Sequence, residues 1–365
     1  MSKAEIYSDL KMPWWIAREG IKYPPVPKHV QIIIASICNM SCSFCAYRQD
    51  GYSSNELFTD GVEVSKYGHN NPQRVMDTER ALRLVQEVKD AGCLSVEWTG
   101  GGEVTAHKDH ERILQSSIDA GLLNALVSNG LKWSPNLIKN ILPKFDWVRV
   151  SIDAGTAETF ARTRQTPETS FGRVLLHTTQ LATEIAAQDS ECVLGTGYVV
   201  TPENWQELVE GVRLAKLTGA KYVRLAAMFS NDGTKPYEPI FADIKRLIGE
   251  AQEKYECDTF KVVDLFRERI QDLMDGKPEY TGCPKMWFNT YVADDLWIYK
   301  CCVTSFSKWG RLTSIKDQTF GEAWKEALPL MQNHDSHGCP PCQFNLGNRA
   351  ALYMLNAKPP HVEWP

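Results

Sequence analysis

The sequence predicts an α/β protein whose parallel strands form a partial (β/α)6 barrel. Six short apolar runs look like strands, and most are closer to continuous than alternating, as expected for strands buried on both faces of a parallel sheet. Helical patterns separate most of them, and this alternation implies right-handed crossovers. We therefore expect functional groups on the loops that leave the carboxyl ends of the strands. The six runs are 29–36, 93–100, 124–130, 146–153, 192–200 and 222–228.

The helical segments carry recognisable start and stop signals. In residues 77–92, Asp77 is a candidate N-cap, Glu79 lies in the first turn and Gly92 is a candidate stop. Similar patterns cover 109–121, 169–188 and 204–219.

The chain divides into a core and a smaller tail module. We expect an N-terminal extension at 1–28, the barrel at 29–235, a helical linker at 236–275 and a second module at 276–365. The composition changes at residue 276, where an aromatic-rich segment predicts a β-hairpin, followed by a short helix near 320–332.

Composition excludes several classes of protein. The 365 residues are 43% hydrophobic and 23% charged, which is ordinary globular composition, and the net charge of −5 argues against a nucleic-acid partner. No segment reaches the ~18 continuous apolar residues of a membrane span, and the N-terminus does not resemble a signal peptide, so we expect a soluble, cytoplasmic protein. In a reducing compartment, clusters among the 11 cysteines favour metal ligation over disulfides.

Three cysteines follow the first predicted strand. Cys38, Cys42 and Cys45 are spaced C-x3-C-x2-C. The plain alternative is a helical face of buried thiols, but the neighbouring residues form no clean apolar stripe. Four thiolates close a zinc site or saturate a cubane cluster, whereas three thiolates on a [4Fe–4S] cluster leave one iron open.

This segment, with Phe44 just before the third cysteine, resembles the radical S-adenosylmethionine (SAM) superfamily. The resemblance implies that SAM binds the open iron through its amino and carboxylate groups and is cleaved to methionine and a 5′-deoxyadenosyl radical. It also places Phe44 and Tyr47 beside the bound SAM, with Tyr47 near the adenine.

Later loops supply matching motifs. Gly101, Gly102 and Glu103 resemble the family's GGE motif, which binds the SAM amino group, although Val104 stands where proline is usual. A glycine run alone would be more typical of a turn. The resemblance also implies that Arg164 pairs with the SAM carboxylate and that four strand-end or loop residues contact SAM, namely Ser128, Asn129, Ser151 and Asp153. The alternative for each is a plain turn or helix cap.

A second cysteine group lies in the tail. Its spacing is C-x17-C-x37-C-x2-C, from Cys283, Cys301, Cys339 and Cys342, and Cys302 adjoins Cys301 as a rival ligand. The segment "DDLWIYKC" resembles the hairpin of SPASM and Twitch domains, which hold auxiliary [4Fe–4S] clusters, and the cysteine number suits the shorter Twitch domain. A structural zinc site is the alternative. The nearby His334 and His337 are alternative ligands, but we expect them to lie in a solvated loop.

Together these features predict a radical SAM oxidoreductase. The 5′-deoxyadenosyl radical would take hydrogen from a substrate C–H, and oxidation or bond formation aided by the auxiliary cluster would follow. We expect a small polar metabolite (a sugar, cyclitol or nucleotide) as substrate, with a ribosomally made peptide as the alternative, and flavodoxin or ferredoxin as electron donor. A non-enzymatic zinc-binding interaction protein is the rival from another class. No substrate-binding or catalytic residue is assigned.

Overall fold

A computed structural model of the chain describes residues 24–48, 73–230 and 232–356. Its centre is one ten-stranded sheet in the order β10-β9-β8-β1-β2-β3-β4-β5-β6-β7, in which β8 and β1 to β7 run parallel. The strands are β1 (His29–Ile32), β2 (Ser95–Trp98), β3 (Leu123–Ser128), β4 (Trp147–Ser151), β5 (Val193–Val200), β6 (Tyr222–Ala227), β7 (Lys261–Asp264), β8 (Asn289–Val292), β9 (Trp297–Tyr299) and β10 (Arg311–Ser314). The predicted α/β class and all six predicted strands are confirmed.

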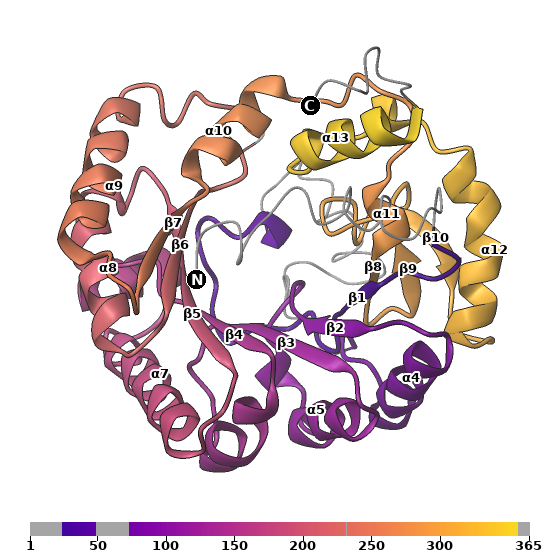
Figure 1. Ribbon diagram of the computed structural model, residues 1–365, viewed down its shortest axis with the longest axis horizontal. Coiled ribbons are helices and arrows are strands. Elements are labelled where there is room, and N and C mark those ends of the chain that lie inside the picture. Colours follow the sequence, from indigo (N-terminus) through magenta and orange to yellow (C-terminus); the bar gives the residue numbers. More distant parts are fainter. Residues whose placement is uncertain (1–23, 49–72, 231, 357–365) are drawn as a thin grey trace, which may run out of the picture.

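Helices cover the outer face of the curved sheet (Figure 1). The described α-helices, of which α10, α11 and α13 face the inside of the curve, are α4 (Thr78–Asp90), α5 (His110–Asp119), α6 (Ala157–Arg164), α7 (Thr169–Ala187), α8 (Leu208–Leu217), α9 (Phe241–Tyr255), α10 (Phe266–Asp275), α11 (Lys285–Phe288), α12 (Phe320–Gln332) and α13 (Asn345–Asn356). A π-helical turn, Leu137–Ile141, precedes β4. In α4 the Asp77 side chain accepts a hydrogen bond from the Arg80 amide at 3.0 Å, as the capping signal predicts.

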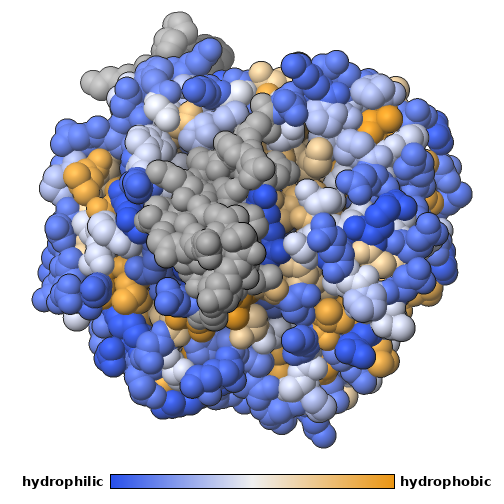
Figure 2. All heavy atoms as spheres, turned by 180° about the vertical axis from the view of Figure 1, so that it is seen from behind, coloured by the Kyte–Doolittle hydropathy of each residue, from blue (hydrophilic) through white to orange (hydrophobic). Residues whose placement is uncertain are grey.

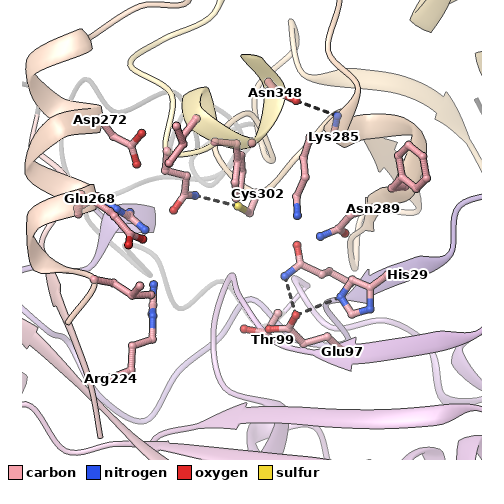
Figure 3. A pocket seen from close by; sticks show the side chains of 18 of the residues that line it. His29, Glu97, Thr99, Arg224, Glu268, Asp272, Lys285, Asn289, Cys302 and Asn348 are labelled. Atoms are coloured by element: carbon pink, nitrogen blue, oxygen red, sulfur yellow. Dashed lines mark hydrogen bonds and ion pairs between the residues drawn. The ribbon is translucent and has the colours of Figure 1, made fainter. Parts of the chain in front are cut away.

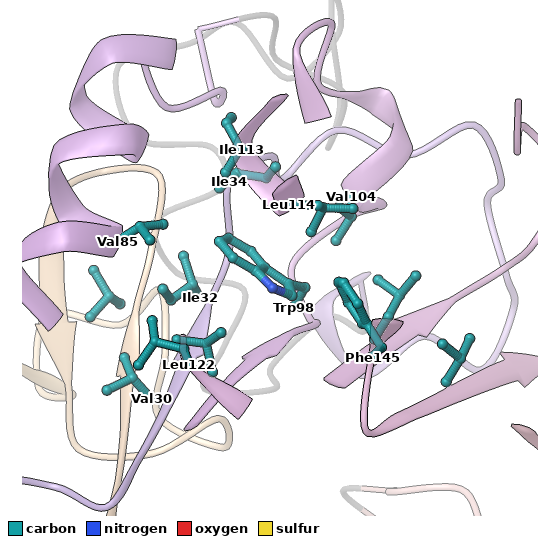
Figure 4. Close-up of a cluster of buried hydrophobic side chains, with 14 of the residues drawn as sticks. Val30, Ile32, Ile34, Val85, Trp98, Val104, Ile113, Leu114, Leu122 and Phe145 are labelled. Atoms are coloured by element: carbon teal, nitrogen blue, oxygen red, sulfur yellow. The ribbon is translucent and has the colours of Figure 1, made fainter. Parts of the chain in front are cut away.

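The core between the sheet and its helices is centred on Trp98 of β2. This indole is completely buried and packs among aliphatic side chains such as Ile34, Val104 and Ile113 (Figure 4). Its Nε1 donates to Asn124 Oδ1 at 3.1 Å, so the one polar atom of the ring is satisfied. The well-packed core holds the carboxyl ends of β1 to β4 in one fixed row.

The tail differs from expectation in how it joins the barrel. Residues 236–275, expected to be helical throughout, include strand β7, which extends the parallel sheet beyond β6. The expected hairpin forms as β8 and β9, and β8 also pairs with β1 in parallel. Short apolar runs fit a helix or a strand equally well, and it is the pairing with β6 that makes β7 a strand. Because β8 lies beside β1, the tail reaches the loop that holds the first three cysteines.

Hydrophobic and hydrophilic residues are interspersed on the face shown in Figure 2. Across the described residues, no helix is both long and apolar enough to cross a membrane.

Candidate active site

The loop after β1 carries Cys38, Cys42 and Cys45, and backbone hydrogen bonds hold it against the end of α6. The amide of Ser41 donates to the Arg164 carbonyl at 3.0 Å, and that of Ser43 donates to the Thr163 carbonyl at 2.8 Å. The loop is therefore fixed at both the strand and the helix, and its three thiols lie at the carboxyl edge of the sheet.

The three thiols share a weakly solvated environment. Burial, followed by the negative charge of Glu103, raises the pKa of Cys38 to about 12. Burial, followed by the neighbouring Cys42, raises that of Cys45 to about 11, and burial also raises the pKa of Cys42. Three thiolates together would need a compensating positive charge, which a metal centre supplies.

Glu103, from the loop after β2, gathers polar groups beside these thiols. Its carboxylate is 3% exposed and accepts hydrogen bonds from Ser128 Oγ at 2.7 Å and from the Asn129 amide at 2.8 Å. The Asn129 side chain turns the other way and donates to Cys38 Sγ at 3.8 Å. One network therefore joins the loops after β1, β2 and β3, as the motifs imply.

Arg164 stands on the other side of the cysteine loop. Its guanidinium forms a buried ion pair with Asp153 and donates to Cys42 Sγ at 3.7 Å. The Phe44 ring lies 5.8 Å from the guanidinium carbon. Arg164 Nε is buried with no hydrogen-bond partner within the described parts of the chain, so one donor of this group is left for another acceptor. Ser151 ends β4, but its hydroxyl joins none of these described contacts.

The glycine loop at 100–103 permits two close approaches. A Cβ on Gly102 would lie 2.2 Å from the Ile37 carbonyl oxygen, so only glycine lets this loop pack on the cysteine loop. A Cβ on Gly100 would lie 1.7 Å from the Tyr291 hydroxyl and 2.7 Å from that of Tyr47. Tyr47 and Tyr291 are hydrogen-bonded to each other, with their oxygens 2.7 Å apart.

Four tail cysteines gather round one small cavity. Cys283, Cys301, Cys339 and Cys342 line a space of about 30 Å³ together with His334 and Trp309. Burial and the neighbouring thiols raise the pKa of Cys283 to about 11 and that of Cys339 to about 12. Cys302 faces elsewhere and lines the large cavity described below. The fold thus separates the two adjacent cysteines that the sequence left as rival ligands.

One feature of the tail departs from expectation. His334 is 6% exposed, and its Nε2 lies 3.7 Å from Cys339 Sγ, so its expected place in a solvated loop is wrong. His337 is exposed, as expected. Leu296, which replaces the glycine of the SPASM and Twitch hairpin, has a φ of 63°. The turn therefore keeps the left-handed backbone that glycine favours despite the substitution.

Both thiol groups suit iron–sulfur clusters in donor chemistry. Within residues 24–48, 73–230 and 232–356, no three His, Cys, Asp or Glu side chains are arranged to hold a single metal ion. The four tail thiols line one small cavity, and a cluster whose irons each take one sulfur fits such a set of donors. For the loop group, the free Nε of Arg164 and the buried Glu103 carboxylate are ready partners for a ligand carrying a carboxylate and an ammonium.

A cavity of about 1110 Å³ lies inside the curve of the sheet (Figure 3). It is bounded by β1, β2 and β6 on one side and by α10 and α13 on others, and it reaches Tyr47 near the cysteine loop and Cys302 in the tail. Its ionisable lining side chains of both signs are Lys28, His29, Glu97, Asp146, Arg149, Arg224, Glu268, Arg269, Asp272, Asp275, Lys285 and Arg349.

The wall formed by β1 and β2 carries an ordered polar group. Glu97 Oε2 accepts from Gln31 Nε2 at 3.1 Å and lies 3.1 Å from His29 Nε2, and His29 Nδ1 lies 2.9 Å from Ser95 Oγ. The hydrogen bond and charge of His29 outweigh burial, so the pKa of Glu97 is lowered. On adjacent β8, the buried Asn289 Oδ1 has no hydrogen-bond partner in the described structure.

Sequence reasoning missed this cavity lining. Alternate residues of β1, His29 and Gln31, both line the cavity, whereas the run 29–36 reads as almost uniformly apolar after Gln31. The polar pair at its start was the available signal. Tyr291 and Asn289 had no such signal, because nothing in the chain order indicates that β8 pairs with β1.

The radical SAM superfamily model matches residues 32–215 of this chain. The chain therefore belongs to the radical SAM superfamily, whose members are enzymes that use a [4Fe–4S] cluster and SAM. A curated relative, the S-adenosylmethionine-dependent nucleotide dehydratase of Lacinutrix mariniflava, is 26% identical over 117 residues. That match covers 32% of this chain and 21% of the relative, so the chain spans about a fifth of its length.

Solved structures share the fold over most of the chain. SuiB of Streptococcus suis bound to precursor peptide SuiA has a TM-score of 0.59 at 13% identity, covering 86% of this chain and 67% of SuiB. The structure of anSMEcpe with bound AdoMet has a TM-score of 0.56 at 16% identity, covering 89% of this chain and 96% of that protein. At these identities the likeness concerns the fold alone.

Proposed function

We propose that this enzyme binds a [4Fe–4S] cluster through Cys38, Cys42 and Cys45 and binds SAM at the open iron. When bound, the pair supplies reductive cleavage of SAM and a 5′-deoxyadenosyl radical. The observation that carries this proposal is the polar network around the three thiols, in which Glu103 and Arg164 offer opposite charges on two sides of the loop. Glu103 would hold the SAM ammonium, and Arg164 would hold its carboxylate.

The remaining SAM contacts would come from the same row of loops. Gly101 and Gly102 would let backbone approach the ligand. Ser128, Asn129, Ser151 and Asp153 would contact or support it from the ends of β3 and β4. Phe44 and Tyr47 would lie beside the bound SAM, with Tyr47 near its adenine.

We place an auxiliary [4Fe–4S] cluster in the tail module, residues 276–365, with Cys283, Cys301, Cys339 and Cys342 as its ligands. Their common cavity supports this set, as does the left-handed turn at Leu296. Four protein ligands would leave no open iron, so the group would exchange electrons with reaction intermediates rather than bind substrate.

The substrate would occupy the 1110 Å³ cavity, between the two thiol groups. Because charged side chains of both signs line it, a small polar metabolite such as a sugar, cyclitol or nucleotide suits it best. Hydrogen removal from a substrate C–H would be followed by oxidation or bond formation. A peptide substrate is the second candidate, because the cavity slightly exceeds the roughly 300–1,000 Å³ of most small-molecule sites.

The electron donor would be a flavodoxin or ferredoxin, and a reducing cytoplasm would keep the 11 cysteines out of disulfides. Anaerobic reconstitution tests the assignment. Two clusters predict about eight irons per chain, whereas one cluster plus a zinc predicts about four. Deuterated sugars, nucleotides and peptides are then offered, and deuterium in 5′-deoxyadenosine identifies the substrate. A protein that binds zinc but neither iron nor SAM would instead match the non-enzymatic alternative.

A further inference from the structure

Three side chains with readily donated hydrogens, those of Tyr47, Tyr291 and Cys302, line the large cavity close in sequence or space to the two thiol groups. Tyr47 belongs to the short helical turn just after Cys45. Tyr291 lies in β8, and Cys302 follows Cys301 in the tail. None of these positions belongs to the cluster ligands proposed above, and all three line the large cavity.

The two tyrosines are in direct contact, and Cys302 packs against the cluster that contains Tyr291. The Tyr47 and Tyr291 hydroxyl oxygens are 2.7 Å apart, and both lie where a side chain on Gly100 would have to stand. Tyr291 is fully buried in an aromatic cluster with Ile33, Ala293, Tyr299 and Phe306. Cys302 packs against this cluster. The Cys302 sulfur is held by a hydrogen bond from Gln343 Nε2 at 3.1 Å. Tyr47 and Tyr291 therefore meet the glycine loop, and Cys302 adjoins Cys301.

The hydrogen-donating groups of Tyr47, Tyr291 and Cys302 differ in chemistry from most of the side chains around them. Apart from Tyr299, whose hydroxyl donates to Asp295, the other buried members of the cluster, Ile33, Ala293 and Phe306, offer only C–H bonds. Phenol O–H and thiol S–H bonds are weaker than the C–H bond that a 5′-deoxyadenosyl radical forms, so hydrogen transfer from them to that radical is downhill. Burial favours the protonated form of the Tyr291 phenol by raising its pKa.

We propose that Tyr47, Tyr291 and Cys302 form a hydrogen-atom relay that disposes of the 5′-deoxyadenosyl radical when no substrate is bound. This inference rests on the SAM cleavage proposed above. It adds a second, self-protecting reaction to the same site, because a radical that is quenched in this way does not attack the barrel wall.

Each step conserves atoms and electrons. Tyr47 gives its hydroxyl hydrogen atom to the radical carbon, which forms 5′-deoxyadenosine and leaves a neutral phenoxyl radical. Tyr291 passes its own hydroxyl hydrogen to Tyr47, and Cys302 passes its thiol hydrogen to Tyr291. A one-electron reductant of the iron–sulfur or flavin class then returns one electron to the sulfur, and solvent returns one proton. In sum, one SAM, two electrons and one proton yield methionine and 5′-deoxyadenosine.

The test needs no substrate. The full chain, reconstituted anaerobically, is given SAM and dithionite in D2O, where phenol and thiol hydrogens exchange for deuterium but C–H hydrogens do not. The relay predicts that most 5′-deoxyadenosine from the wild type carries one deuterium. Tyr47→Phe should reduce the labelled fraction to the level of undirected quenching. Tyr299→Phe is the control, since Tyr299 is a buried tyrosine of the same cluster that bonds Asp295 instead, and it should leave labelling unchanged.

Freeze-quench electron paramagnetic resonance gives a readout separate from product formation. Tyr291→Phe and Cys302→Ala should prolong a tyrosyl signal that narrows with ring-deuterated tyrosine, because each change blocks refilling of the radical. Unlabelled 5′-deoxyadenosine from the wild type, or equal labelling in Tyr47→Phe and Tyr299→Phe, would overturn the relay and leave SAM cleavage intact. If no variant forms 5′-deoxyadenosine, the proposed function fails and the relay fails with it.

Discussion

The two cysteine groups of this chain have opposite surroundings. The three loop thiols face Asn129, Arg164 and the Glu103 network, so charged and polar groups lie beside them. The four tail thiols enclose a space of about 30 Å³ with mostly apolar or aromatic neighbours. Three thiols with polar neighbours suit a centre that takes an outside ligand, and four thiols around a closed space suit a centre that is complete in itself.

The largest effect should come from removing the loop group. Changing Cys38, Cys42 and Cys45 together to Ala should abolish 5′-deoxyadenosine formation and lower the iron content from about eight to about four per chain. Cys93→Ala, at a buried thiol in the hydrophobic core, should change neither quantity. Continued 5′-deoxyadenosine formation by the triple variant would mean that the two groups do not differ as we propose.

The tail group predicts a sharp contrast between neighbours. Cys301→Ala should lose about four irons per chain, because Cys301 faces the other tail thiols, whereas Cys302→Ala should keep all of them. Iron and sulfide analysis after anaerobic reconstitution makes the comparison. Equal losses in both variants would show that the fold does not separate these two thiols in the loaded protein.

Glu103 tests the polar side of the loop group. Glu103→Gln removes the charge while keeping an acceptor for Ser128, so the fold should survive. A hydrogen bond to a charged group contributes about 1.5–3 kcal/mol, so we expect SAM affinity to weaken by about 10- to 100-fold. Equilibrium dialysis against labelled SAM measures it, with the exposed Glu79→Gln as control. Unchanged affinity would remove Glu103 from the SAM site.

The last prediction is on stability alone and concerns the contact between the barrel and the tail. Asp294, in the turn after β8, accepts a hydrogen bond from Ser36 Oγ at 2.5 Å, and its Oδ2 has no partner among the described residues. Burial raises its pKa to about 7, so the folded state holds a proton that the unfolded state loses at lower pH. This contribution to stability is complete below the unfolded pKa of about 4 and is lost as the pH rises to 7, at up to about 1.4 kcal/mol per pH unit.

Asp294→Asn should therefore flatten the fall in the free energy of unfolding between pH 5 and 7. Denaturant unfolding of the cluster-free protein at several pH values measures the slope. An identical slope in the wild type and the variant would assign the pH dependence to other groups.

Much of this arrangement could be read from residue order. Repeated strand and helix patterns predict the sheet, and Asp77 and Gly92 mark the ends of α4 almost to the residue. The cysteine spacing and the glycine loop follow the ends of successive strands, so parallel topology alone brings Cys38, Glu103 and Asn129 together. By contrast, β7 lay hidden in a segment with helical periodicity, because its four residues are too few to show a pattern against their flanks.

The sequence by itself therefore determined the fold class, the three-cysteine loop and the polar groups that follow neighbouring strands, since each depends on local pattern and on parallel order. Only the tertiary structure decided that β8 pairs with β1, that Tyr291 reaches Gly100, that Cys301 and Cys302 face different cavities and that His334 is buried. These features depend on contacts between residues far apart in the chain. Residue spacing carries no record of such contacts until the sheet has set which strands are neighbours.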